Sequence, residues 1–189
     1  MRKQRITLIQ KQYKFDEASN SYLIEVSLDD YDDVYDEWDA APFKKRFIQE
    51  EFDDFLIESA EDIPPKFTLW IVLYIPEQKK DTVKEKAVEA AYKNYYAYAV
   101  EKAEEKRITL RKKSIKYLML SLLFLSIGYF FQSTYENVIF NVLEEGIFIG
   151  GWVFLWEFFT DIFMTRRELK AKYRLMIRLY NADIKFIYF

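Results

Sequence analysis

The sequence contains two apolar stretches, YLMLSLLFLSIGYFF at residues 117–131 and GIFIGGWVFLWEFFTDIFM at residues 146–164. No Lys or Arg lies between residues 117 and 165, whereas basic residues are concentrated outside both stretches. This distribution is typical of two membrane spans whose outer ends lie in the cytoplasm. We therefore predict a two-span transmembrane hairpin. The alternative is a pair of buried helices in a soluble protein.

Basic side chains flank the predicted hairpin on both sides, seven at residues 102–116 and six at residues 166–178. Those nearest the predicted membrane boundary are Lys112, Lys113, Lys116, Arg166 and Arg167. Anionic lipid headgroups would attract them, so we expect the lipid bilayer to be a partner. The first span is slightly short, and Lys116 can extend it because its ammonium group can reach the membrane surface.

The composition restricts the chemistry that the chain can perform. The 189 residues include no Cys and no His, which excludes disulfides, thiolate zinc sites and His-based triads. An enzyme would have to rely on carboxylates, Lys, Tyr or Ser, and we favour a non-enzymatic protein without a cofactor. Residues 1–80 carry 11 basic and 18 acidic side chains. This excess of negative charge argues against nucleic acid as a partner.

Three stretches in the first half have the pattern of strands, at residues 5–13, 21–28 and 67–75. The second alternates, with Tyr22, Ile24, Val26 and Leu28 on one face, and the third is a nearly unbroken apolar run typical of a central strand covered on both faces. Helical spacing follows Pro42 to about residue 60, and a long helix can begin at Asp81 or Thr82 and continue into the first span.

These elements predict an α+β fold: a small β-β-α-β-α soluble domain, with helices on one sheet face, joined by a long helix to a two-helix transmembrane hairpin. The predicted parts are a cytoplasmic α/β domain with a long C-terminal helix at residues 1–112, the two-span membrane hairpin at residues 113–165, and a cytoplasmic tail at residues 166–189. The tail begins as a basic amphipathic helix suited to a membrane surface. Its last residues alternate and could add a strand to the sheet edge.

The second apolar stretch has a polar and small-residue face. Gly146, Gly150, Glu157 and Asp161 fall within about 60° of one another at 100° per residue. In the first stretch Ser121 and Gly128 also share a face. We interpret the small residues as sites of close helix packing.

Glu157 is the unusual member of this face, because an ionised carboxylate inside a membrane costs about 2–3 kcal/mol. Three interpretations remain open: a polar clamp between helices or subunits, the lining of a water-filled path in an oligomer, or contact with another partner. Asp161 lies one turn nearer the cytoplasm, where Lys116 could reach it.

The acidic run at residues 29–39 carries seven carboxylates. Carboxylates bind Ca²⁺ and Mg²⁺, but the run lacks the spaced acids and central Gly of a calcium loop. We therefore interpret it as a solvated loop, with a metal site as the alternative.

Two stretches resemble segments of uncharacterised bacterial membrane proteins. They are Trp38-Asp-Ala-Ala-Pro-Phe-Lys-Lys-Arg46 and Glu145-Gly-Ile-Phe-Ile-Gly-Gly-Trp-Val-Phe-Leu-Trp156. The resemblance implies a cytoplasmic α/β domain followed by a membrane hairpin in a bacterial inner membrane, and it carries no activity. It draws attention to Asp39 and Arg46 as a structural ion pair.

Together these features favour a membrane-anchored interaction or sensing protein with both termini in the cytoplasm. Its partner would be another protein, a small ligand or a second copy of the chain. The alternative is an oligomeric membrane effector or small channel, gated by the cytoplasmic domain.

Overall fold

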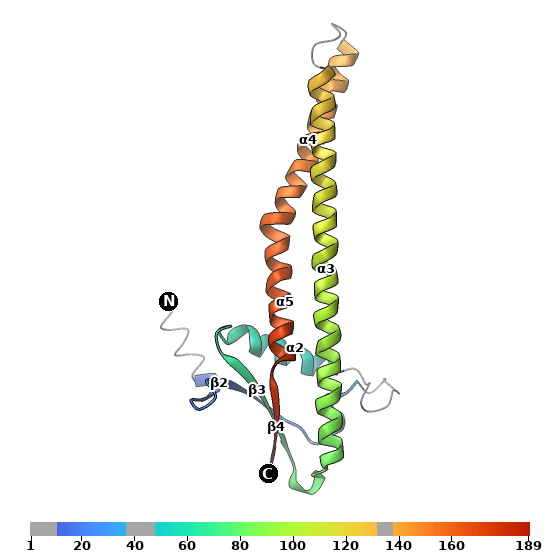
Figure 1. Cartoon of the computed structure of the whole chain (residues 1–189). Helices are drawn as coiled ribbons and strands as arrows, with labels where there is room; N and C mark the ends of the chain where they lie inside the picture. The colour runs from blue at the N-terminus through green and yellow to red at the C-terminus, as the bar shows by residue number, and fades with distance from the viewer. Residues whose placement is uncertain (1–10, 37–47, 132–137) are drawn as a thin grey trace. The chain divides into compact units, whose positions relative to one another are not determined.

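The computed structural model describes residues 11–36, 48–131 and 138–189 (Figure 1). The chain is a mixed α/β protein with one four-stranded sheet and long helices. It divides into two units. The sheet unit comprises Met1–Glu101 and Tyr173–Phe189, and the helical unit comprises Lys102–Lys172.

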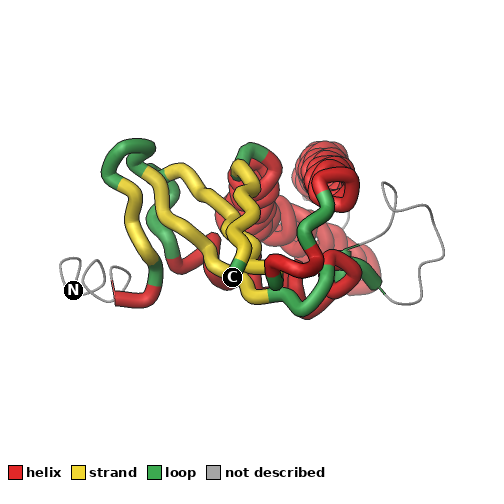
Figure 2. The backbone as a smooth tube through the Cα atoms, turned by 90° about the horizontal axis from the view of Figure 1, so that it is seen from below, coloured by secondary structure: helices red, strands yellow, loops and turns green. Residues whose placement is uncertain are grey.

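The sheet has the strand order β1-β2-β3-β4 (Figure 2). The strands are β1 (Lys14–Asp16), β2 (Ser21–Ser27), β3 (Thr68–Ile75) and β4 (Asp183–Tyr188). β1 is antiparallel to β2, while β3 lies parallel to both β2 and β4. The C-terminal strand therefore adds to the sheet edge, as its alternating sequence predicts.

One face of the sheet forms the core of the sheet unit. The register places Tyr22 beside Leu69 and Ile24 beside Ile71, and all four side chains are buried. The opposite face carries Leu23, Trp70 and Tyr74, which are only partly buried, and Val72, which is buried. The expectation that β3 is covered on both faces is therefore confirmed only in part, since this second face of the sheet is partly exposed.

Three helices supply the rest of this core. They are α2 (Glu50–Asp62), α3 (Thr82–Phe131) and α5 (Arg166–Tyr180). The Asp53 carboxylate of α2 accepts hydrogen bonds from Tyr95 (2.9 Å) and Tyr96 (2.6 Å) of α3. Burial and this carboxylate raise the pKa of both phenols, so they stay protonated as donors. The interpretation of the Tyr-rich segment as core is confirmed at Tyr92 and Tyr96, which are buried.

The start of α3 agrees with the sequence. The Asp81 carboxylate accepts hydrogen bonds from the backbone N–H groups of Val83 and Lys84, which satisfies two free donors of the first turn. α3 then runs without a break from the sheet unit into the first apolar stretch. The expected continuous helix is confirmed.

Three other local predictions need correction. The acidic run is not a simple loop, because Tyr31–Val34 form the 3-10 helix η1 and bury Tyr31 and Val34. Residues 11–13 are not part of a strand, since β1 begins at Lys14. Ile48 is not part of the helix predicted after Pro42, because it forms a β-bridge with Tyr35 and α2 begins at Glu50. The remainder of the predicted strand, Pro42 itself and the ion pair between Asp39 and Arg46 lie outside the described residues.

The helix α5 is predicted to lie on a membrane surface, but its C-terminal part packs into the core of the sheet unit. Met176 and Leu179 are buried in the sheet unit, and the Tyr92 hydroxyl donates to the Leu179 carbonyl at 2.8 Å. Arg178, which the sequence places among the basic residues flanking the predicted hairpin, instead donates to backbone carbonyls of the segment between α2 and β3. These carbonyls belong to Ala60 (2.6 Å), Ile63 (2.8 Å), Pro64 (3.1 Å) and Phe67 (3.2 Å). Partial burial lowers the pKa of Arg178 below its usual value, and the guanidinium still remains charged.

In the helical unit, α3 is followed by α4 (Val138–Thr160), the π-helical turn η4 (Asp161–Thr165) and the start of α5. Two of its helical stretches are long and apolar enough to cross a membrane, by length and composition. Most of their apolar side chains are exposed rather than packed.

Replacing Arg178 tests its structural role. We expect Arg178→Met to destabilise the sheet unit by about 2–3 kcal/mol, because several partly buried carbonyls lose a charged donor. Hydrogen exchange at the amides of β3 and β4 measures this loss. Arg174→Met is the matched control, since Arg174 is exposed on the same helix. Equal effects of the two substitutions would contradict the assignment.

Candidate functional site

The helical unit contains a buried carboxylate with two partners. Asp161 is only 3% exposed. Its carboxylate accepts a hydrogen bond from the Ser114 hydroxyl at 3.3 Å and lies 3.6 Å from the Lys113 ammonium. Ser114 also donates to the Leu110 carbonyl at 2.9 Å, one turn earlier in α3. A buried charge is costly unless it is paired, so this cluster ties the first turn of η4 to α3.

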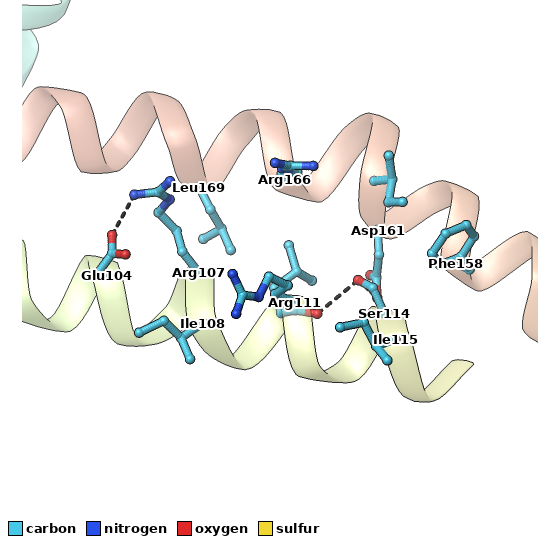
Figure 3. A pocket seen from close by; sticks show the side chains of 12 residues that line it. Glu104, Arg107, Ile108, Arg111, Ser114, Ile115, Phe158, Asp161, Arg166 and Leu169 are labelled. Carbon is cyan, nitrogen blue, oxygen red and sulfur yellow. Dashed lines mark hydrogen bonds and ion pairs between the residues drawn. The ribbon is translucent and has the colours of Figure 1, made fainter. Parts of the chain in front are cut away.

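A cavity of about 230 Å³ lies beside this cluster, between α3 and the segment that joins α4 to α5. Its apolar wall includes Ile108, Ile115, Phe158, Ile162 and Leu169, and its basic wall consists of Arg107, Arg111 and Arg166 (Figure 3). The π-helical turn lines one side through Asp161 and Ile162. Single π turns inside long helices are frequent at functional sites.

The cavity is lined by more basic than acidic side chains. Glu104 pairs with Arg107 at 2.5 Å, and Asp161 faces Lys113. The side chains of Arg111 and Arg166 make no hydrogen bond or ion pair with another residue in the described ranges. The cavity can therefore offer two guanidinium groups to an anion, beside an apolar surface.

The four residues of the predicted polar and small-residue face on the second apolar stretch have different surroundings in the structure. Gly150 lies against α3, where an added Cβ would be 3.1 Å from the Phe124 ring, and Asp161 is buried as described. In contrast, Gly146 has no atom within 4 Å of its hypothetical Cβ, and Glu157 is exposed. Only half of this face therefore meets the neighbouring helix.

The residues singled out on the first stretch are both buried. Ser121 is fully covered, and a Cβ on Gly128 would be 3.1 Å from the Phe148 ring. The closest approach occurs at Gly151, where a Cβ would come within 2.8 Å of the Leu125 side chain and 3.2 Å of its backbone nitrogen. Gly151 is not among the residues that the sequence pattern singles out, although it directly follows Gly150.

The five basic residues nearest the predicted boundary have different surroundings. All five are exposed, but Lys113 also faces Asp161 and Arg166 also lines the cavity. Lys113 thus takes the place that the sequence suggested for Lys116. On an α-helix Lys116 is about 200° from Ser114, so it points away from the buried carboxylate.

In the described part of the acidic run, Asp30 and Asp33 bind other groups of the protein. Asp30 accepts from the Tyr31 N–H and binds Lys79 (2.8 Å) and Lys84 (3.3 Å). These partners, Lys79 foremost, lower the pKa of Asp30 to about 2. Asp33 accepts from the backbone N–H groups of Asp29 and Asp30. Within the described ranges, no three acidic side chains are grouped as a metal site would require.

Comparisons with protein-family models, with curated proteins and with solved structures give no significant match to this chain.

The contact at Gly151 can be tested against a matched glycine. We expect Gly151→Ala to destabilise the pairing of α3 with α4 by about 1–3 kcal/mol, because its methyl group collides with Leu125. Gly146→Ala, whose methyl group has open space, should have little effect. Thermal unfolding in detergent, followed by circular dichroism, compares the two variants. A larger loss for Gly146→Ala would refute the packing described here.

Proposed function

We propose that this chain is a membrane-anchored, non-enzymatic interaction or sensing protein of a bacterial inner membrane, with both termini in the cytoplasm. The helical unit would be the anchor, and the sheet unit would bind a protein or small ligand. The single observation that carries the proposal is the apolar surface of the helical unit.

This surface consists of large apolar side chains that are mostly exposed. Phe130 is 78% exposed, Trp156 is 73% exposed and Phe163 is 69% exposed, and many Leu, Ile and Val side chains of α3 and α4 accompany them. Water-soluble monomers rarely expose contiguous apolar surface of this extent. A lipid bilayer would cover it, and the absence of Lys and Arg from residues 117–165 supports the same environment.

The pairing of β4 with β3 supports the proposed topology. The chain leaves the sheet unit along α3 and returns to it along α5 before β4 joins the sheet. A folded sheet unit therefore requires both ends of the helical unit to be on one side of a membrane. An even number of spans satisfies this requirement.

The partly exposed sheet face supports an interaction role for the sheet unit. Trp70 and Tyr74 of β3 stand between Leu23 of β2 and Ile187 of β4, and all four are partly exposed. Tyr and Trp are enriched in protein interfaces because they combine a large apolar area with a polar tip.

Cysteine labelling tests the anchor and its topology, because the chain has no Cys of its own. In intact bacterial cells, we expect a membrane-impermeant maleimide to label Ser133→Cys, between the apolar stretches. Glu77→Cys and Asn181→Cys should react only after permeabilisation. Release of the wild type by alkaline carbonate, or equal labelling of all three sites, would refute the proposal.

The exposed position of Glu157 favours a second candidate function, the oligomeric effector or small channel. A carboxylate on the outer surface of an inserted helix requires a polar neighbour, which a second copy of the chain or a water-filled path could supply. This candidate would place Glu157 between subunits.

A single substitution separates the two candidates. If subunits meet at Glu157, Glu157→Gln should reduce chemical cross-linking of the chain in vesicles several-fold and reduce dye leakage through them. Glu168→Gln, which also removes one exposed carboxylate but lies outside the apolar stretch, is the control. A wild type that neither cross-links nor leaks would eliminate the oligomeric candidate.

A further inference from the structure

We propose that the cavity of the helical unit binds the phosphate group of an anionic phospholipid. This inference rests on the proposed membrane anchoring, and it adds the ligand class and the residues that recognise it. The recognised chemistry is a phosphate group held by arginines next to an apolar wall. A free phosphate ion would share the first part of this chemistry but not the second.

Arg111 and Arg166 are the phosphate ligands in this proposal. They approach the cavity from two elements, Arg111 from α3 and Arg166 from the first turn of α5 (Figure 3). A guanidinium group presents a planar fork of N–H donors that matches two phosphate oxygens. Because neither side chain has an acidic partner within the described ranges, binding an anion would not require an existing ion pair to break.

The acidic residues of the cavity limit the charge of the ligand. Glu104 and Asp161 also line it, but each already faces a basic side chain, Arg107 and Lys113 respectively. Two guanidinium groups therefore remain to balance the ligand. This supply matches a headgroup with one phosphate and is too small for a polyphosphate.

The apolar wall distinguishes a lipid from a soluble anion. Ile115, Phe158 and Ile162 line the cavity on the side of the apolar stretches, and Arg107 and Leu169 line it on the side away from them. The volume of about 230 Å³ is below that of typical drug-sized sites, so it suits a headgroup and not a whole lipid. The acyl chains would continue along the exposed apolar surface of the helices.

The position along the chain agrees with this chemistry. Arg111 precedes the first apolar stretch by six residues, and Arg166 follows the second by two. In an inserted hairpin both would lie at the level of the anionic headgroups, where basic side chains gain electrostatic energy. A bound phosphate would bridge the two helices at this level.

Native mass spectrometry of the full-length chain in neutral detergent tests the proposal. The probes are phosphatidylglycerol and zwitterionic phosphatidylcholine, each with and without millimolar inorganic phosphate. The double variant Arg111→Gln with Arg166→Gln is compared with the double variant Lys112→Gln with Arg167→Gln. The control removes the same charge from exposed residues that do not line the cavity.

We expect one phosphatidylglycerol molecule to bind the wild type and the control in preference to phosphatidylcholine. The cavity variant should bind it at least tenfold more weakly, as expected for the loss of charged hydrogen bonds. Circular dichroism establishes that each variant is folded. Competition by inorganic phosphate would support the phosphate site and show that its ligand can also come from solution.

Equal weakening in the cavity variant and the control would overturn the proposal, because charge alone would then explain binding. So would equal binding of both lipids by the wild type. Alkaline carbonate extraction separately reports on the anchor. If it releases the wild type, membrane anchoring fails, and a thermal shift of the same variants with inorganic phosphate still decides whether the cavity binds this group.

Discussion

The parallel pairing of β4 with β3 is the constraint on which the rest of the chain depends. These strands are separated by the whole of the helical unit, so their pairing closes a very long loop and the closure carries an entropic cost. Several contacts of α5 offset this cost before β4 begins. Arg178 and Leu179 connect α5 to the α2–β3 segment and to α3, and Lys93 donates to the carbonyls of Tyr180 and Ala182. The return of the chain is therefore built into the core of the sheet unit.

Two polar side chains, the partly buried Arg178 and the buried Asp161, have comparable tasks in the two units. In the sheet unit, Arg178 satisfies carbonyls that the end of α2 leaves without intrahelical partners. In the helical unit, Asp161 is held by Ser114 and Lys113 at the point where the helix takes a π turn. A charged side chain of this kind contributes little net stability when its partners are present. If Arg178 or Asp161 lost its partners, the unpaired charge would strongly destabilise the fold. The two side chains restrict which segments can lie next to each other, which apolar packing alone does less strictly.

The local sequence pattern was sufficient to predict most of the helices and strands. The incorrect predictions are explained by tertiary contacts. The alternation through Tyr22 and Ile24 and the apolar run of β3 predicted their strands, since those side chains are the core of the sheet unit. The 3-10 helix in the acidic run was missed because its carboxylates obscured the spacing of Tyr31, Val34 and Tyr35, all of which are buried. The role of Arg178 could not be predicted, because its carbonyl acceptors come together only in the folded unit.

In the candidate site, too, the sequence could not predict the tertiary contacts, here the direction in which each residue of the second apolar stretch points. Helical geometry related Gly146, Gly150, Glu157 and Asp161 to one another, but an apolar stretch carries no sign of which direction meets the neighbouring helix. Gly151, Phe154 and Phe158 lie on the contacting side, and at 100° per residue their mean direction is about 113° from Gly146 and about 93° from Glu157. Gly150 and Asp161 fall nearer this direction and are packed. Glu157 is thereby left on the outer surface, while Asp161 borders the arginine-lined cavity. Two carboxylates one turn apart thus have separate environments, and any ligand of the cavity encounters Asp161 and not Glu157.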